Sequence, residues 1–266
     1  MIAVASRPVD GARLVLHQAR YELLSFWRNP QSRFFTLLLP IVFLVIFATV
    51  IGGTTTTPSG ARVKISTYYV AGIATLAIIA ATFTNLAVSI VTQRELGVLK
   101  RRRATPVPAS ALIAGRALVA VVTSLVLVAV LIVVGRVAFG VHLPTTTLPG
   151  VALASIVGAL AFSCLAFAVS AFITTADAAQ PVLQFVTLPL YFISGVFVPD
   201  ANNPRWLRQI ANVFPVRHLA QALLFAFDPT SHGPGLAWGQ IAAVAAWGTG
   251  GLIVAVRRFR WSPANR

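Results

Sequence analysis

The chain has 266 residues, of which 57% are hydrophobic and only 10% are charged. Because an ordinary soluble domain is about a quarter charged, this composition excludes a typical water-soluble protein. The net charge of +15, from 21 Lys and Arg against 6 Asp and Glu, indicates either nucleic acid or a membrane surface as a partner. The basic residues form short runs between long apolar stretches, without a basic stripe interleaved with aromatics, which favours a membrane and argues against nucleic acid.

The single cysteine and the polar first 30 residues exclude two further features. Cys164 lies in an apolar stretch and has no partner in the sequence, so neither an intrachain disulfide nor a thiolate metal cluster is expected, and we predict no metal site. The first 30 residues carry too many ionisable side chains for a signal peptide. We therefore expect the first membrane span to stay in the mature protein.

The first predicted element is an amphipathic helix over residues 13–29. An apolar face with Trp and Phe opposite an arginine-bearing face is typical of a helix that lies in the lipid headgroup region. The alternative is a helix packed on a soluble domain, but the sequence predicts no such domain. The apolar face consists of Val15, Leu16, Ala19, Leu23, Phe26 and Trp27, and the polar face of Arg13, His17, Gln18, Arg20, Glu22, Ser25 and Arg28.

Six stretches are apolar over about 20 residues, the length that crosses a hydrocarbon core of roughly 30 Å as a helix. Arg116 lies in the first turn of the third stretch, where its long side chain can extend to the interface. The sequence thus predicts an all-α membrane protein in which residues 1–266 form one transmembrane domain. The predicted spans are 33–52, 68–92, 112–135, 149–174, 181–199 and 236–256.

The basic residues predict the orientation of these spans. An even number of spans places both termini on one side, and the side with more Lys and Arg is the cytoplasmic one. The low lysine count beside many Arg, Ala and Val residues is typical of a GC-rich bacterial genome, so we expect a bacterial cytoplasmic membrane. Fifteen basic residues lie before span one, after span two or after span six (Arg7, Arg13, Arg20, Arg28, Arg33, Arg94, Lys100, Arg101, Arg102, Arg103, Arg116, Arg257, Arg258, Arg260, Arg266), and six lie in the other loops (Arg62, Lys64, Arg136, Arg205, Arg208, Arg217).

Two segments are expected on the outer side. Residues 53–67 are rich in Gly and Thr and predict a flexible connection, followed by Tyr68 and Tyr69 as an interfacial anchor. Residues 198–235 contain two apolar runs, each opened by a proline, which predict two short helices that dip back into the outer leaflet. An ordinary surface loop is the alternative for this second segment.

No ionisable residue lies in the middle of a predicted span, which argues against a proton or sodium relay. Asp177, Asp200, Asp228 and His142 are all placed at or beyond the ends of spans. Uncharged polar residues do occur within the second and fifth spans, where they either line a substrate path or hydrogen-bond between helices. These candidates are Thr82, Thr84, Asn85, Ser89, Gln184, Thr187 and Ser194.

Glycines in the last predicted span have two readings. Gly248, Gly250 and Gly251 could allow a neighbouring helix to approach closely, or they could belong to a loop that cradles phosphate. A phosphate loop follows a strand outside the lipid, so we favour close helix packing.

The most informative segment is the predicted inner loop over residues 93–108, which is dense in charge and ends in two prolines. Residues 93–103 are predicted to form a short helix that Thr105 and Pro106 terminate. A simple positive-inside stop explains the arginines, but it does not explain Glu95, Gly97 or the Pro-x-Pro exit.

This loop resembles the R-E-x-G-x-L-(K/R)-R-x-R-A-T-P-x-P segment of type 2 ABC exporter permeases, the group that contains the daunorubicin-resistance membrane subunits. The matching residues are Arg94, Glu95, Gly97, Leu99, Lys100, Arg101, Arg103, Ala104, Thr105, Pro106 and Pro108. The Ser194–Pro199 segment likewise resembles the Ser-Gly-x-Phe-x-Pro sequence that commonly ends the fifth span of such permeases. Gln93 departs from the pattern, because family members often carry a second acidic residue there.

The resemblance implies that residues 93–108 form a coupling helix seated in a groove of a separate ATPase subunit. The implied contact residues are Arg94, Glu95, Leu96, Gly97, Leu99, Lys100, Arg101, Arg103, Thr105 and Pro106. The sequence contains no G-x-x-x-x-G-K-(S/T) phosphate loop, so ATP and Mg²⁺ are expected in the partner and no cofactor in this chain.

Because six spans enclose no path alone, the resemblance implies two permease chains, identical or related, with two ATPase subunits among membrane lipids. The predicted function is export of a hydrophobic or amphipathic drug or lipid by a non-catalytic permease. An ion-coupled carrier is the first alternative. An intramembrane enzyme is the second, although no carboxylate pair, His cluster or Ser-His constellation lies at membrane depth.

Overall fold

The structure is a computed structural model of the 266-residue chain. It describes residues 16, 17, 19–21, 23, 24, 28, 34–57, 60, 62–99, 109–199, 203–231 and 233–258, and the side chains of residues 35 and 109–113 lie outside the description.

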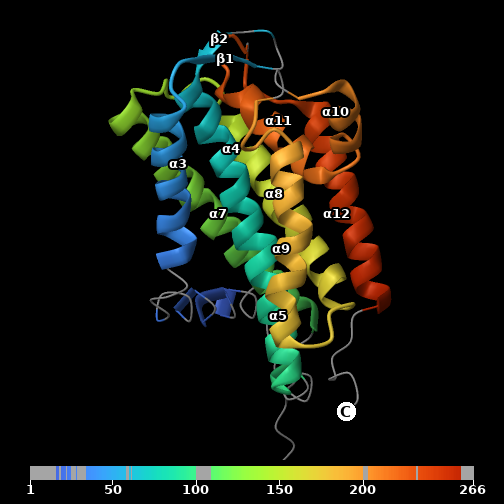
Figure 1. The fold of residues 1–266 in the computed structure, drawn as a ribbon. Coiled ribbons are helices and arrows are strands. Elements are labelled where there is room, and N and C mark those ends of the chain that lie inside the picture. The colour runs from blue at the N-terminus through green and yellow to red at the C-terminus, as the bar shows by residue number, and fades with distance from the viewer. Residues whose placement is uncertain are drawn as a thin grey trace, which may run out of the picture.

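The described chain is a bundle of long helices with a small β-hairpin at one end (Figure 1). We name the end with the hairpin the outer end and the opposite end, where Glu95 and Arg258 lie, the inner end. In chain order the elements are the π-helix η1 (Phe34–Leu38), α3 (Leu39–Val50), β1 (Thr54–Thr56), β2 (Arg62–Lys64), α4 (Ile65–Ile79), the π-helix η2 (Ala80–Thr84), α5 (Asn85–Glu95), α7 (Ala109–Phe139), α8 (Leu148–Ser170), α9 (Ala176–Ile193), α10 (Arg205–Ala211), α11 (Pro215–Phe227) and α12 (Trp238–Arg258).

Four helices of the described chain are long and apolar enough to cross a membrane. They are Ile65–Glu95, which joins α4, η2 and α5, then Ala114–Phe139 within α7, α8 and α12. The predicted span at 33–52 corresponds to a shorter apolar helix, Thr36–Val50, and the predicted span at 181–199 corresponds to α9, which is not among these four. The all-α membrane architecture is therefore confirmed, whereas the number of six spans stays a prediction.

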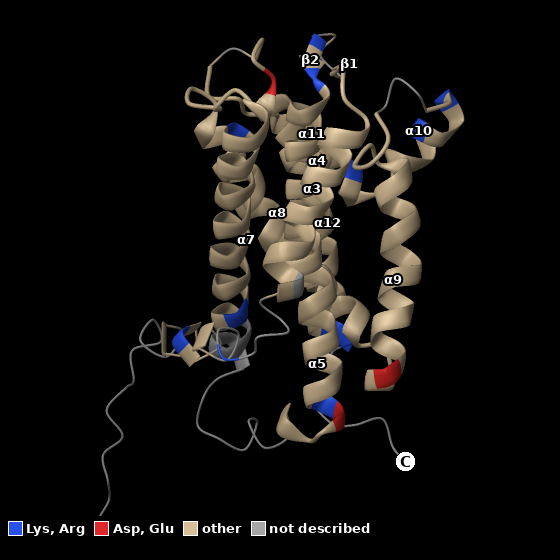
Figure 2. Cartoon of the chain, turned by 60° about the vertical axis from the view of Figure 1, so that its left-hand side comes forward, with Lys and Arg blue, Asp and Glu red and all other residues tan. Residues whose placement is uncertain are grey.

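The Lys, Arg, Asp and Glu residues of the described helices lie near the ends of the bundle (Figure 2). The middle of the bundle is apolar, as the sequence predicts for a helix bundle in lipid. Residues 16–28, in so far as they are described, are helical and lie across the bundle axis at the inner end (Figure 1). Their position in the lipid headgroup region stays a prediction.

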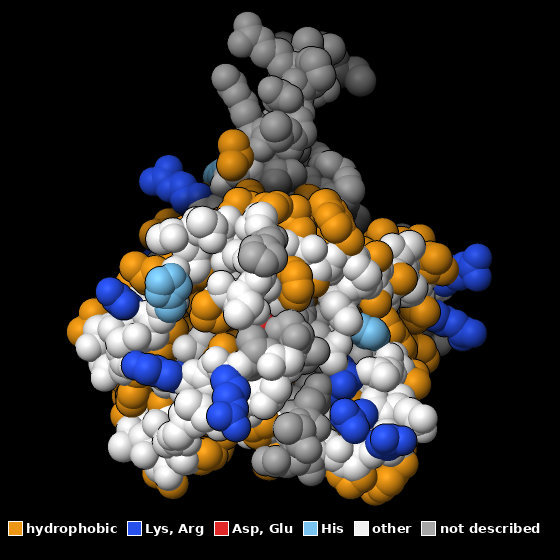
Figure 3. All heavy atoms as spheres, turned by 90° about the horizontal axis from the view of Figure 1, so that it is seen from above, with side chains coloured by type: hydrophobic (Ala, Val, Ile, Leu, Met, Phe, Trp, Pro, Cys, Tyr) orange, Lys and Arg blue, Asp and Glu red, His pale blue; other side chains and the backbone are white. Residues whose placement is uncertain are grey.

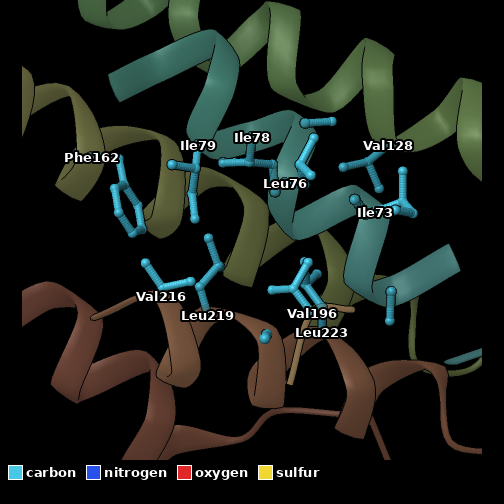
Figure 4. Packing of buried hydrophobic residues seen from close by; sticks show 14 of the residues in the cluster. Ile73, Leu76, Ile78, Ile79, Val128, Phe162, Val196, Val216, Leu219 and Leu223 are labelled. Carbon is cyan, nitrogen blue, oxygen red and sulfur yellow. The ribbon is translucent and has the colours of Figure 1, made fainter. Parts of the chain in front are cut away.

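The core of the bundle forms around α4, whose fifteen residues are all buried. Figure 4 shows Ile73, Leu76 and Ile79 of α4 among side chains of α7, α8 and α11. Because α4 is apolar on every side, burial on all sides is the arrangement that its composition favours.

The segment before α4 differs from the prediction. Residues 53–67 were expected to form a flexible connection, but β1 and β2 pair antiparallel within them and α4 already begins at Ile65. Tyr68 and Tyr69, expected at the interface, are 2% and 0% exposed. They are not interfacial anchors, because both hydroxyls bind backbone carbonyls in the segment that follows α9.

That segment, Ser194–Pro199, is not the end of a helical span, since α9 stops at Ile193 and Gly195 has a φ of +78°. Tyr69 donates to Phe197 O at 3.1 Å, and Tyr68 donates to Gly195 O. A Cβ at Gly72 of α4 would lie 2.5 Å from Val196 O, so the segment rests directly on α4 at the outer end. The close approach depends on glycine at residue 72.

Close packing of α12 on α8 also depends on glycine. The sequence predicts this for Gly248, Gly250 and Gly251, and the structure shows it for Gly248 and Gly251. A Cβ at Gly248 would lie 2.7 Å from Ala161 Cα, and one at Gly251 would lie 3.0 Å from Leu165 N. A Cβ added at Gly250 would have no atom within 4 Å, so Gly250 faces away from α8.

The predicted pair of short helices after α9 is present as α10 and α11, which meet at an angle of 101°. Ten of the thirteen residues of α11 are buried, against α4, α8 and α12. In Figure 1, α9 reaches the outer end and α12 starts there, so the α10–α11 pair leaves from and returns to that end.

Candidate functional site

The predicted coupling segment begins at the inner end of α5. The helix predicted over residues 93–103 is not continuous, because α5 ends at Glu95, Gly97 has a φ of +69°, and the chain is helical again at Val98 and Leu99. A glycine in the left-handed conformation is a common helix terminator, since other residues are strained there. Lys100, Arg101, Arg103, Thr105 and Pro106 lie outside the described residues.

Arg94 does not point out of the molecule, although it belongs to the predicted contact surface. Its side chain is 3% exposed and donates to Ser170 O at 2.8 Å and also to Ile173 O. Ser170 is the last residue of α8, where carbonyls have no partner within the helix and carry partial negative charge. The guanidinium, a planar fork of donors, therefore closes the end of α8.

Glu95 reaches the beginning of the next helix. Its Oε2 accepts a hydrogen bond from Ala176 N at 2.6 Å, and Ala176 is the first residue of α9. A carboxylate at a helix N-terminus satisfies a free N–H and interacts favourably with the helix dipole. Thr175 caps the same helix, because its hydroxyl accepts from Ala178 N at 3.4 Å.

Gln93 contacts a third helix. Its Oε1 accepts from the Nη2 of Arg116 in α7, and its Nε2 donates to Ser89 Oγ at 2.9 Å. Arg116 is 4% exposed, so the expectation that it extends to the membrane interface is wrong. A buried guanidinium needs an acceptor, and Gln93 supplies one.

The two leucines of the segment have opposite surroundings. Leu99 is 1% exposed and packs with Ile90, Phe167 and Ala255, so it anchors the chain after Gly97 to α5, α8 and α12. Leu96 is 66% exposed. Within the described part of this segment, Leu96 and Glu95 are thus the side chains most exposed to a partner protein, while Gln93 and Val98 are half-buried.

The candidate path residues lie on elements that pack together, since α9 contacts both α5 and η2. Thr82 and Thr187 bind carbonyls of their own helices, at Ile78 O (2.7 Å) and Leu183 O (2.9 Å). The Nδ2 of Asn85 donates to Thr36 Oγ1 at 3.3 Å, which is an interhelical bond. Ser194 is 1% exposed and its hydroxyl has no hydrogen-bond partner among the described residues, while Thr84 is buried and Ser89 and Gln184 are half-buried.

A cavity of about 350 Å³ opens at the outer end, between α11, the start of α12 and Thr57. Its wall includes Asp228, a 2% exposed carboxylate that accepts from Thr57 Oγ1 at 2.8 Å and from Thr230 N at 2.9 Å. These bonds join the hairpin to the end of α11. Seen from this end, Lys and Arg side chains are spread around the face (Figure 3). No group of His, Cys, Asp and Glu among the described residues could hold a metal ion.

Sequence reasoning missed the partners of Gln93, Arg94 and Glu95. Each partner lies far along the chain, with separations of 23, 76 to 79 and 81 residues. One of these contacts had a signal in the sequence. Arg116 is a charged residue inside an apolar helix, and such a charge needs a polar partner.

A family model of the ABC-2 type transporter matches residues 14–227 of the chain. No curated protein matches the chain at a significant level. The matched region runs from the first described helical residues to the end of α11 and includes the inner end of α5. Because it covers well over half of the 266 residues, the chain belongs to the ABC-2 type transporter family and is the membrane-spanning permease of an ABC transporter.

Proposed function

We propose that the chain is the permease of an ATP-driven exporter that moves a hydrophobic or amphipathic compound, such as a drug or a lipid, outward. ATP and Mg²⁺ bind to two copies of a separate ATPase subunit, and a second permease chain, identical or related, completes the path. Six spans cross a bacterial cytoplasmic membrane, the inner end of the bundle faces the cytoplasm, and α10 and α11 are re-entrant.

The observation that supports this proposal best is the inner end of α5. There the segment that resembles the coupling loop begins, and three successive side chains bind α7, the end of α8 and the start of α9. Force applied by an ATPase at Leu96 would therefore reach several helices at once. A passive charge-stop loop has no need of these contacts.

The apolar middle of the described helices supports ATP as the energy source. An ion-coupled carrier needs charged residues along its path, and the Lys, Arg, Asp and Glu residues of the described helices lie near the ends (Figure 2). The neutral candidate path residues on η2, α5 and α9 suit a substrate without a required charge.

The test is a pull-down of the tagged chain from mild detergent, followed by identification of proteins that come with it. We expect an ATPase subunit, and we expect Leu96→Ala to weaken its recovery by roughly tenfold, because one buried interface side chain contributes about 1–2 kcal/mol. Val137→Ala is the matched control, since Val137 is an 82% exposed aliphatic residue of α7 near the outer end. A chain that purifies without any ATPase, and transports with ATP depleted but a proton gradient present, contradicts the proposal.

A further inference from the structure

The turn between α8 and α9, residues 171–175, is held at both ends by α5. Arg94 binds Ser170 O and Ile173 O at the α8 side, and Glu95 binds Ala176 N at the α9 side. Consecutive residues on a helix point about 100° apart, so two neighbouring side chains can reach two different helix ends. The five-residue turn is thus fastened to a single point of α5.

The Arg94 contact is costly to break. Arg94 is 3% exposed and Ile173 is 5% exposed. Breaking their hydrogen bond would therefore leave both the guanidinium and the Ile173 carbonyl buried without it. Hydrogen bonds that involve a charged donor are about twice as strong as neutral ones. A displacement of α5 that keeps these bonds must therefore carry the turn with it.

The turn also carries a large exposed apolar side chain at the end of the bundle where Leu96 lies. Phe172 is 67% exposed and Leu96 is 66% exposed, although both are large and apolar. Thr174 and Asp177 are exposed beside Phe172. The exposed residues of the turn are thus connected to the inner end of α5 through the hydrogen bonds of Arg94 and Glu95.

We propose that Arg94 is a positioning residue that makes the inner end of α5 and the turn 171–175 move as one body during the transport cycle. The inference rests on the proposed function. Under it, motion imposed at Leu96 reaches α8 and α9 through the guanidinium, and no ATPase contact by Arg94 itself is required.

Cross-linking tests this motion directly. In a Cys164→Ser background, Thr92→Cys and Phe172→Cys are joined by bifunctional thiol reagents of graded length. Thr92 is a half-buried residue in the last turn of α5 and does not belong to the predicted ATPase contact. ATP-driven transport is then measured in vesicles with the ATPase subunit. We expect the cross-linked complex to keep transport within about twofold of the same double-cysteine protein treated with a monofunctional reagent. Loss of transport on cross-linking, with the monofunctional control active, overturns the inference, because the two sites would then have to move apart.

A second variant separates positioning from simple stabilisation. Arg94→Met is expected to lower transport at least tenfold while the ATPase subunit is still recovered, and the 92–172 cross-link is expected to restore most of the loss. Arg94→Lys, which keeps the charge, should retain an intermediate rate. Unchanged transport in Arg94→Met overturns the inference. Failure to recover any ATPase with the unaltered chain is a different result, which contradicts the proposed function instead.

Discussion

Gln93 shows how much a single side chain decides at the inner end of α5. It accepts from Arg116 and donates to Ser89, so its amide bridges α7 and α5. Related permeases often carry an acidic residue at this place, and a carboxylate would accept from the same guanidinium. Gln93 therefore keeps an acceptor for Arg116, although it lacks the negative charge of a carboxylate.

Substitution of Gln93 should reveal this equivalence. We expect Gln93→Glu to keep stability and transport, because the acceptor for Arg116 stays. Gln93→Leu should lower the free energy of unfolding by about 1–3 kcal/mol, because it removes an acceptor from a buried guanidinium. Thermal melting in detergent measures the stability of both variants. Equal melting temperatures for the Glu and Leu variants would show that residue 93 does not stabilise the protein as an acceptor for Arg116.

Tyr69 carries a residue-scale prediction for the outer end. Tyr69→Phe removes the hydroxyl that donates to Phe197 O, and we expect a loss of about 1–2 kcal/mol of stability. Tyr21→Phe, at a residue that is 59% exposed, serves as the control and should change melting by less than about 0.5 kcal/mol. A larger loss of stability from Tyr21→Phe than from Tyr69→Phe would contradict the prediction.

At the scale of elements, the α8–α12 pair depends on which glycine faces the neighbouring helix. Gly248→Ala places a methyl group 2.7 Å from Ala161 Cα, so the helices must separate, and we expect a loss of about 1–3 kcal/mol. Gly250→Ala meets nothing within 4 Å and should stabilise by up to about 1 kcal/mol, because alanine favours helix. Thermal melting of the two variants in parallel measures the sign of each change in stability. A stabilising Gly248→Ala would show that α8 and α12 are not in contact at this residue.

The same scale shows what sequence patterns could and could not predict. Long apolar runs predicted the helices because burial in lipid requires about 20 such residues, and the prolines before α10 and α11 predicted their starts. The break after Glu95 was missed because the residues on both sides of Gly97 are good helix formers, and the left-handed conformation of Gly97 interrupts the helix before it resumes at Val98. The hairpin was missed because its three-residue strands are too short to show a pattern.

Hydrogen bonds between distant elements were beyond prediction from the sequence. Tyr69 and Phe197 are 128 residues apart, and Arg94 and Ser170 are 76 apart. Tyrosine pairs and inner-loop arginines have common interfacial roles, and only the tertiary arrangement shows that these side chains turn inward. The candidate path residues were recognised as polar groups in apolar helices, and their role as a path stays a prediction.

At the scale of the whole molecule, the orientation of the bundle can be measured. In a Cys164→Ser background, we expect a membrane-impermeant thiol reagent to label Arg62→Cys and Arg205→Cys in intact cells. Thr174→Cys and Arg258→Cys should be labelled only after the membrane is opened. The first two exposed positions lie at the outer end and the last two at the inner end. Labelling in the reverse order would invert the proposed orientation and remove the ATPase-facing role of α5.

The π-helix η2 has a mechanical consequence for the rod that α4, η2 and α5 form. This rod has 31 residues, so it is about 46 Å long, and it is fastened at its outer end by Tyr68 and Tyr69 and at its inner end by residues 93–95. A π-turn interrupts the regular hydrogen-bond ladder of an α-helix and is a common place for a helix to bend. A tilt of the inner half by about 5° about Ala80–Thr84 would swing Glu95 by roughly 2 Å, while the tyrosines keep their bonds.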